Sequence, residues 1–236
     1  MMLILGNATS LREAVVQQLR AEIVSGRAGA GTIYSVPGLA TALGVSTTPV
    51  REALLELTRA GLVSPLRNRG FLVEAATLKD LEDLFAVRVL LERFALETLA
   101  RERLTNIEPL KALADAVAAT VTREDVNGYI ETDRRFHEAL VARANNPRLT
   151  RLIMAQRDDM RLYGIDSREG RERQVASVGE HYQMIEYGLA GKVHEIGELI
   201  TRHIMEWKPL FAAALGLSQP QSSMRGRVSE AAPVPE

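Results

Sequence analysis

The sequence contains no cysteine among its 236 residues, so disulfide bonds cannot stabilise the fold, and an oxidising compartment is not indicated. No stretch approaches the roughly 18 consecutive apolar residues that a membrane-spanning helix requires. The first residues, MMLIL, lack a basic leader and a signal-peptide cleavage pattern. We therefore expect a soluble cytoplasmic protein that does not associate with membranes.

Aromatic residues and net charge are also scarce. Phe, Trp and Tyr make up 5% of the chain and the formal net charge is -1. Few aromatics argue against stacking on single-stranded nucleic acid, and a net charge near zero argues against a protein coated in basic residues. The charge is nevertheless divided unevenly, because residues 1–74 hold 7 Arg and Lys against 5 Asp and Glu, whereas the remainder holds 22 against 25.

Two helices are predicted at the start of the chain. Ser10 and Glu13 have the spacing of a capping box, and apolar residues then recur at helical intervals until Gly26, a suitable C-terminal stop. Ser35, followed by Val-Pro, opens a short second helix that ends at Gly44. These two helices should precede a third almost without a linker.

The third helix and a β-hairpin complete the N-terminal unit. Pro49 is tolerated only in a first helical turn, so one of the hydroxyl residues at 46–48 caps the new helix. Residues 62–64 and 71–73 are β-prone, and the Asn and Gly within 67–70 suit a tight turn between them. Three helices followed by a hairpin indicate a winged helix-turn-helix.

The rest of the chain predicts an all-α bundle of about six helices. A first helix starts after Thr77, and further helical segments are expected near 106–122, 125–144, 147–163, 169–190 and 192–215. Residues 218–236 are rich in Ser, Pro and Gln and should be disordered. The predicted fold is thus mainly α, with a winged helix-turn-helix at 1–75, a helical domain at 76–217 and a tail at 218–236.

The start of the third helix is a candidate DNA-reading site. In a helix-turn-helix, the N-terminal residues of the second helix contact base edges in the major groove, which places Ser46, Thr47, Thr48 and Arg51 on the DNA side. The hairpin tip, with Arg67, Arg69 and Gly70, would then reach the minor groove or its flanking backbone. The simpler interpretation is a helix cap and solvated arginines, but the order of elements favours DNA binding.

The spacing of the four histidines predicts the helix face on which each one lies. His203 is in step with Ile200 and Trp207, so it should point inward, whereas His194 should point outward. Asp133 and His137, four residues apart, share a face with apolar neighbours, and His181 is in step with Val178 and Ile185. Three inward histidines and one aspartate form a possible ligand set for Zn, Ni or a similar divalent ion. Hydrogen-bonded core histidines and a solvated ion pair are the alternative.

One arginine interrupts an apolar stripe. Arg88 lies in step with Leu84, Leu91 and Ala95, and a buried guanidinium needs a carboxylate partner. Glu92, four residues further on, can supply it.

The segment LATALGVSTTPVREALLELTRAGLV, Leu39 to Val63, resembles the recognition segment of the GntR family of bacterial transcription regulators, and RNRGFLV resembles that family's wing. The resemblance extends through the second domain, which is similar to the all-helical FCD effector domain of the FadR-like branch. Two positions depart from the family pattern. The family usually has arginine where this chain has Thr47, and a basic residue where Pro37 is followed by Gly38. We expect weaker affinity or a different operator as a result.

The resemblance also implies a metal and an effector. Many FCD domains carry a D-x-x-F-H pattern, which Asp133, Phe136 and His137 match, together with two later histidines at the positions of His181 and His203. It further implies a cavity that takes small carboxylates beside the metal. The candidates for contacting such an acid are Arg88, Tyr129, Arg134 and Asn145.

Together these features predict a homodimeric regulator that binds double-stranded operator DNA of palindromic sequence and responds to a small organic acid. One alternative is a metal-dependent enzyme, although no H-E-x-x-H pattern is present. Another is a regulator whose metal is purely structural.

Overall fold

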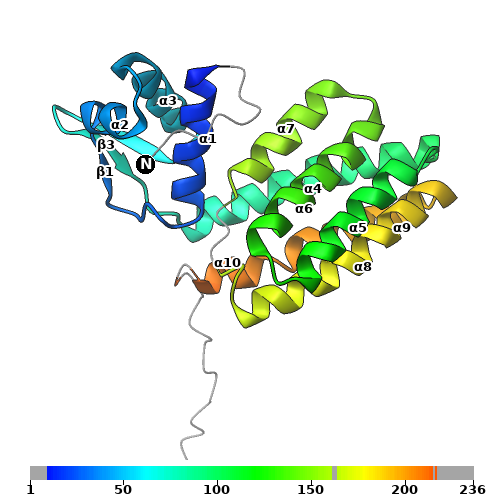
Figure 1. The fold of residues 1–236 in the computed structure, drawn as a ribbon. Helices are drawn as coiled ribbons and strands as arrows, with labels where there is room; N and C mark the ends of the chain where they lie inside the picture. The colour runs from blue at the N-terminus through cyan, green and yellow to red at the C-terminus, as the bar shows by residue number, and fades with distance from the viewer. Residues whose placement is uncertain (1–9, 161–163, 215, 217–236) are drawn as a thin grey trace, which may run out of the picture.

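The computed structural model describes residues 10–160, 164–214 and 216, and the predicted tail at 218–236 lies outside this part. The described chain forms two bodies, a smaller N-terminal unit and a helical bundle (Figure 1). The N-terminal unit has its own hydrophobic core, separate from that of the bundle. No helix in the described ranges is long and apolar enough to cross a lipid bilayer.

The N-terminal unit is a winged helix-turn-helix, as the sequence predicted. Its elements are α1 (Leu11–Val24), β1 (Ile33–Tyr34), α2 (Val36–Leu43), α3 (Thr47–Arg59), β2 (Val63–Leu66) and β3 (Gly70–Val73). The predicted cap of α1 forms, because the Ser10 hydroxyl accepts a hydrogen bond from the Glu13 amide at 3.2 Å. Ser35 caps α2 in the same way through Gly38, at 3.3 Å. Gly44 ends α2 in the left-handed conformation, with φ 69°.

The wing is a three-stranded sheet rather than a simple hairpin. β3 lies between β2 and the unpredicted strand β1, in the order β1-β3-β2, and both pairs are antiparallel. Gly70 is needed here because its φ is 117° and a Cβ would lie 2.1 Å from the carbonyl oxygen of Tyr34. Asn68, at φ 58°, makes the turn as its residue type suggests.

Helix α3 is held against α1 by its apolar face. Val50, Leu54 and Leu57 on α3 are fully buried, as are Leu19 and Ile23 on α1. This packing leaves the opposite face of α3 and its N-terminus in solvent, since the apolar residues occupy only one stripe of the helix.

The bundle contains seven α-helices within the described residues, where about six were expected. They are α4 (Leu78–Glu102), α5 (Glu108–Thr122), α6 (Val126–Val141), α7 (Pro147–Asp158), α8 (Arg168–Ala190), α9 (Val193–Met205) and α10 (Lys208–Ala214). The segment expected at 192–215 is divided into α9 and α10, and the helix expected at 147–163 ends at Asp158. A short 3-10 turn, Ala142–Ala144, follows α6.

Polar side chains lie inside this bundle. Helices α4 and α9 pack along each other, as do α5 and α6, around a core of Leu, Ile, Val and Phe. Within that core the structure also buries Arg88, Glu92, His137, His181 and His203. Burying charged or polar groups is costly unless they find partners, so these five residues locate the candidate site.

Candidate metal centre and DNA-reading surface

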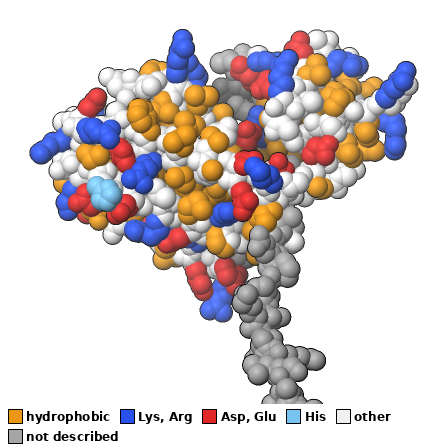
Figure 2. All heavy atoms as spheres, turned by 180° about the vertical axis from the view of Figure 1, so that it is seen from behind, with side chains coloured by type: hydrophobic (Ala, Val, Ile, Leu, Met, Phe, Trp, Pro, Cys, Tyr) orange, Lys and Arg blue, Asp and Glu red, His pale blue; other side chains and the backbone are white. Residues whose placement is uncertain are grey.

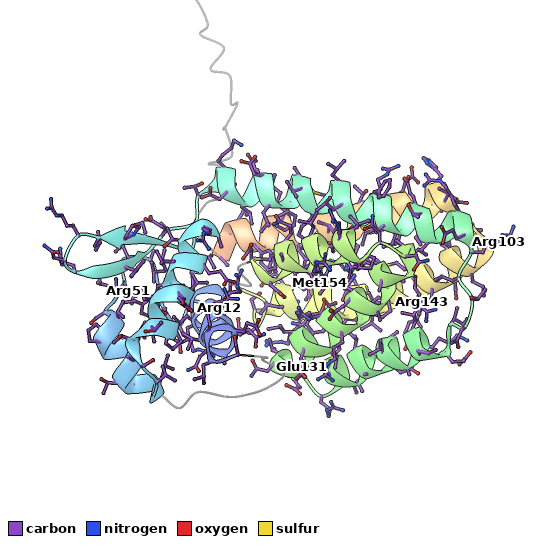
Figure 3. The ribbon with its side chains drawn as sticks, turned by 90° about the horizontal axis from the view of Figure 1, so that it is seen from above. Arg12, Arg51, Arg103, Glu131, Arg143 and Met154 are labelled. Carbon is purple, nitrogen blue, oxygen red and sulfur yellow. The ribbon has the colours of Figure 1, made fainter. Side chains whose placement is uncertain are left out.

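The N-terminus of α3 is exposed and has no side-chain cap. Ser46 occupies the N-cap position but makes no capping hydrogen bond through its side chain. Ser46, Thr47, Thr48 and Arg51 are all exposed, and Arg51 lies on the winged unit far from the bundle (Figure 3). The first-turn N–H groups and three hydroxyls are therefore accessible to a phosphate or a base edge.

The tip of the wing supplies exposed positive charge. Arg67 and Arg69 are exposed on either side of Asn68. Gly70 is partly buried, and its close approach to Tyr34 gives it a structural role in the sheet. Two arginines on a projecting turn suit contact with the DNA backbone or the minor groove.

Three histidines from three helices meet inside the bundle. His137 on α6, His181 on α8 and His203 on α9 each offer a ring nitrogen, and these atoms lie within 4.8 Å of one another. The side chains of His137 and His181 are 0% exposed and that of His203 is 3% exposed, whereas that of His194 is 75% exposed. The inward and outward orientations expected from helix spacing are confirmed.

The cluster lacks protein partners for several of its atoms. Both ring nitrogens of His137 and both of His181 are buried without a hydrogen bond from the described protein atoms. Leaving one buried polar atom unsatisfied costs about 1–3 kcal/mol, so four such atoms in one place need an explanation. A divalent cation fits one nitrogen of each ring, because neutral imidazole nitrogens are common ligands of Zn and Ni.

Asp133 borders the cluster. Its Oδ1 lies 3.3 Å from His181 Nε2 and 3.7 Å from His137 Nε2. Burial alone would raise the pKa of Asp133, but His137 and the guanidinium of Arg157 hold it well below its usual range. Asp133 is therefore an ionised carboxylate at the edge of the histidine cluster.

His203 is oriented from outside the cluster. Its Nδ1 lies 2.6 Å from Glu180 Oε2, so the imidazole donates to this carboxylate, and Nε2 remains as its candidate ligand atom. Arg173 donates to the same carboxylate oxygen and to the His203 carbonyl. Neither Glu180 nor Arg173 was predicted from the sequence. Glu180 directly precedes His181, but neighbouring residues on a helix point in different directions, so the link to His203 was not visible.

A chain of buried ion pairs adjoins the site. Arg88 Nε donates to Glu92 at 2.8 Å, as the sequence suggested. Arg157 donates to the other oxygen of Glu92 at 2.9 Å and to Asp133 Oδ2 at 2.8 Å. Arg157 was not predicted as part of the site. The sequence did contain a signal for it, since Arg157 follows Leu149 and Ile153 at four-residue intervals and so lies on their buried face.

The four effector candidates are divided by the structure. Arg88 is buried, bonded to Glu92 and 2.8 Å from the Met160 sulfur, while the Tyr129 hydroxyl is bonded to Ser177 at 2.9 Å. Tyr129 lies one helical turn before Asp133 on α6, and Arg88 is connected to Asp133 through Glu92 and Arg157.

The other two candidates are not brought to the cluster. Arg134 is 42% exposed and pairs with Asp158 and Glu138. Asn145 is exposed and ends the 3-10 turn in the left-handed conformation, with φ 54°.

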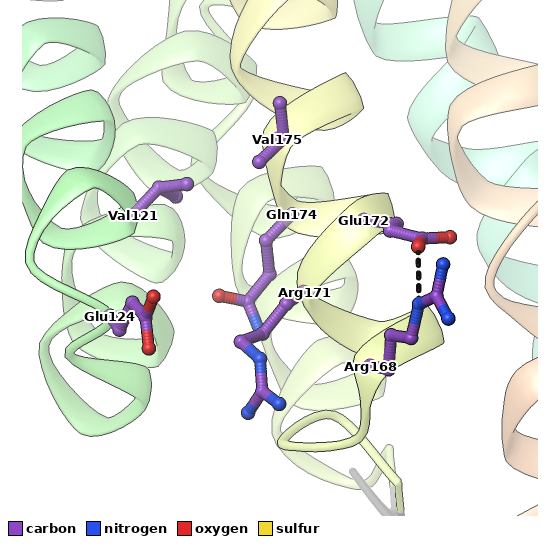
Figure 4. Close-up of a pocket in the computed structure, with 7 residues that line it drawn as sticks. All are labelled: Val121, Glu124, Arg168, Arg171, Glu172, Gln174 and Val175. Carbon is purple, nitrogen blue, oxygen red and sulfur yellow. Dashed lines mark hydrogen bonds and ion pairs between the residues drawn. The ribbon is translucent and has the colours of Figure 1, made fainter.

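A separate hollow of about 280 Å³ opens on the surface between the end of α5 and the start of α8 (Figure 4). It is lined by Val121, Glu124, Arg168, Arg171, Glu172, Gln174 and Val175. Arg168 is paired with Glu172 at 3.0 Å, and the lining charges are of both signs. The hollow contains none of the candidate ligands.

The two bodies match two family models. Residues 11–73 match the model described as bacterial regulatory proteins, gntR family, and residues 83–206 match the model described as the FCD domain. The matched ranges fall on the winged unit and on the bundle.

Relatives of known description agree with these matches. The chain is 30% identical over 211 residues to the uncharacterized HTH-type transcriptional regulator BphR of Paraburkholderia xenovorans. This alignment covers 85% of this chain and 84% of the relative. It is 34% identical over 131 residues to the gluconate operon transcriptional repressor of Bacillus subtilis, covering 54% of this chain and 52% of the relative. The solved structure of E. coli McbR/YncC is similar at a TM-score of 0.71 and 26% identity, over 89% of this chain and 98% of that one.

The buried histidines predict a pH dependence for the metal-free protein. Burial lowers the pKa of His203 to about 4, and burial with the charge of Arg157 lowers that of His137 well below its usual value. The unfolded chain then binds more protons below pH 6.5, so acid favours unfolding. His203 alone should cost roughly 2 kcal/mol of stability between pH 7.5 and 5.

Urea denaturation in the presence of a chelator measures this loss. A His203→Gln variant should show a smaller loss over the same pH range, while His194→Gln, changed at an exposed histidine, should behave like the unaltered protein. A stability that is constant from pH 7.5 to 5 would show that the histidines are not held neutral.

Proposed function

Since this chain belongs to the GntR family of bacterial regulators and carries an FCD domain, it is a DNA-binding transcription regulator and not an enzyme, and from this premise we propose that it senses a small carboxylate through a divalent metal held by the histidine cluster. The observation that carries the proposal is the set of buried, unpartnered imidazole nitrogens contributed by α6 and α8. Without a bound ligand, burial of these nitrogens would cost desolvation free energy that no interaction offsets.

In the proposed site, Asp133, His137, His181 and His203 hold the ion. Three of these residues already converge, and the fourth has its Oδ1 on the edge of the cluster. A bound Zn or Ni ion would act as a Lewis acid that attracts the carboxylate of an organic acid. Glu180 keeps the His203 ring in place, and the surrounding apolar core limits access of bulk water.

The proposed effector contacts are Arg88 and Tyr129. Both side chains are buried near Asp133, but Arg88 is engaged by Glu92 and Tyr129 by Ser177. An entering acid would therefore compete with Glu92 for the guanidinium, and the resulting exchange of partners is a difference that an effector can use to shift one conformation against another. The relative named for a gluconate operon supports a link to organic acids.

The proposed DNA contacts are Ser46, Thr47, Thr48 and Arg51 on α3, with Arg67, Arg69 and Gly70 at the wing. The exposed helix end and the hydroxyls suit phosphates, and Arg51 suits a guanine edge or a phosphate.

We also propose that the protein acts as a homodimer. Val87, Leu90 and Phe94 are 41%, 70% and 56% exposed and follow one another at helical intervals along α4. Figure 2 views the molecule from behind, where α4 lies, and hydrophobic side chains gather across this face. A stripe of this kind suits burial against the same stripe of a second copy.

Replacement of Arg51 should weaken DNA binding. If Arg51 reads a base, Arg51→Ala should cost about 1–3 kcal/mol in affinity for an operator selected from random DNA, as measured by fluorescence anisotropy. Arg59→Ala is the matched control, because Arg59 is an exposed arginine at the other end of α3. Equal affinities for the two variants would remove Arg51 from the recognition surface.

Replacement of Leu90 should dissociate the dimer. Leu90→Glu places a charge on the exposed stripe, and light scattering should report the chain mass of 26.0 kDa, whereas the unaltered protein should give twice that mass. Leu189→Glu, on α8, changes a leucine that is 47% exposed and should remain dimeric. A dimeric Leu90→Glu protein would show that α4 is not the interface.

The metal and the effector are tested together. His181→Ala should lose most of its bound metal in mass spectrometry, because one of the four proposed ligands is removed, while the exposed His194→Ala should retain it. Small mono- and dicarboxylates are then screened by thermal shift with added zinc and after chelation. An acid present at 100 times its Kd should stabilise the metal-loaded protein by about 2.7 kcal/mol.

The outcomes of this screen separate two roles of the metal. Stabilisation by an acid only in the presence of zinc supports the sensor. Loss of stability on chelation, with no effect of any acid, would indicate a structural metal instead.

A further inference from the structure

Three consecutive residues at the end of α7 each bind a different part of the protein. The first, Arg157, is 7% exposed and bridges Glu92 on α4 and Asp133 on α6, with N–O distances of 2.9 and 2.8 Å. Asp133 thus uses one carboxylate oxygen toward the histidines and the other toward Arg157. A guanidinium buried to this degree cannot remain without a counter-charge, so its position depends on where Asp133 lies.

The second residue ties α7 to α6 again. Asp158 accepts two hydrogen bonds from Arg134, at 2.7 and 3.0 Å, in a bidentate pair. Arg134 directly follows Asp133, so two successive residues of α6 are paired with two successive residues of α7. This double link means that a displacement of α6 at Asp133 is passed to the end of α7 rather than absorbed between the helices.

The third residue reaches the other body. Asp159 accepts a hydrogen bond from Arg20 on α1. The Arg20 side chain is 18% exposed and that of Asp159 is 22% exposed. Helix α1 is the part of the winged unit that faces the bundle (Figure 1). Among the described elements, no helix or strand of the winged unit packs extensively against a bundle helix, so this ion pair is a prominent link.

Arg20 is in turn close to the DNA-reading helix. Burial lowers the pKa of Arg20, and the charges of Asp158 and of Glu56 on α3 oppose this shift. Glu56 also pairs with Arg12 of α1 at 3.2 Å. Because α1 and α3 share one apolar core, a shift of α1 at Arg20 moves α3 with it.

We propose that Arg157 is a positioning residue for Asp133 and that the end of α7, through the Asp159–Arg20 pair, transmits occupation of the metal site to the DNA-reading unit. This inference rests on the metal site of the proposed function. With an ion bound, Asp133 would offer Arg157 less counter-charge, so Arg157 would be held more by Glu92 and would carry Asp158 and Asp159 with it. Arg20 would follow Asp159, and the winged unit would turn relative to the bundle.

The test compares the effect of zinc on operator affinity between variants. For each protein the Kd for the selected operator is measured with zinc and with a chelator, and the ratio of the two values reports the coupling, so that any direct effect of a substitution on DNA binding cancels. Coupling free energies in allosteric proteins commonly correspond to about 5–150-fold. We expect a ratio in this range for the unaltered protein.

The variants isolate the ion pair. Arg20→Met should reduce the ratio to less than about 2-fold while zinc affinity, measured by competition with a chromogenic chelator, is unaltered. The exchange of both residues, Arg20→Asp with Asp159→Arg, should restore the ratio. Arg12→Met is the matched control, because Arg12 is also on α1 and paired, but its pair with Glu56 lies within the winged unit.

The possible results distinguish the coupling route from the metal site on which it rests. A ratio in Arg20→Met equal to that of the unaltered protein would overturn the coupling route while the metal sensor stands. Zinc that binds without changing operator affinity in the unaltered protein would overturn the coupling and leave a structural metal. Absence of zinc binding would reject the metal site itself and this inference with it. Amide hydrogen exchange of α1 gives a second reading, since zinc should alter its protection in the unaltered protein and not in Arg20→Met.

Discussion

Compensation of buried charge is the constraint on which the bundle depends. Arg88 and Glu92 on α4, Arg157 on α7 and Asp133 on α6 form one continuous chain of ion pairs inside an apolar core. Removing one member of a buried pair costs about 3–5 kcal/mol, because the other member is left as an uncompensated charge. These linked ion pairs therefore hold α4, α6 and α7 in one arrangement, and they place the Asp133 carboxylate beside the histidines.

The histidines are governed by the same constraint but are not satisfied by the protein alone. His203 has Glu180, whereas within the described residues the ring nitrogens of His137 and His181 have only the nearby Asp133 carboxylate and no well-formed hydrogen bond. In the proposed function a metal ion supplies what these atoms lack, so metal binding contributes to folding as well as to sensing. A ligand that alters the ion's coordination would then act on groups that already set the helix positions.

The proposed DNA-reading surface has the opposite character. Its hydroxyls and arginines are exposed, and Ser46 makes no capping hydrogen bond through its side chain, which leaves these groups available for phosphates and bases. The buried, paired polar groups of the bundle and the exposed polar groups of α3 belong to bodies with separate hydrophobic cores. The ion pair between Arg20 and Asp159 joins them, and two charges at a partly exposed contact can be rearranged at a lower cost than a packed core.

The sequence by itself determined the winged helix-turn-helix, most helices of the bundle and the inward direction of His137, His181 and His203, because caps, glycine stops and helical periodicity are local signals. It did not indicate β1, whose two residues form a strand only because β3 lies beside them. Only the tertiary structure decided that Arg157 links Asp133 to Glu92, that Arg134 and Asn145 lie away from the cluster, and that three ring nitrogens converge within 4.8 Å. The reason is that such contacts join helices distant in the chain, and their positions depend on how all the helices pack together.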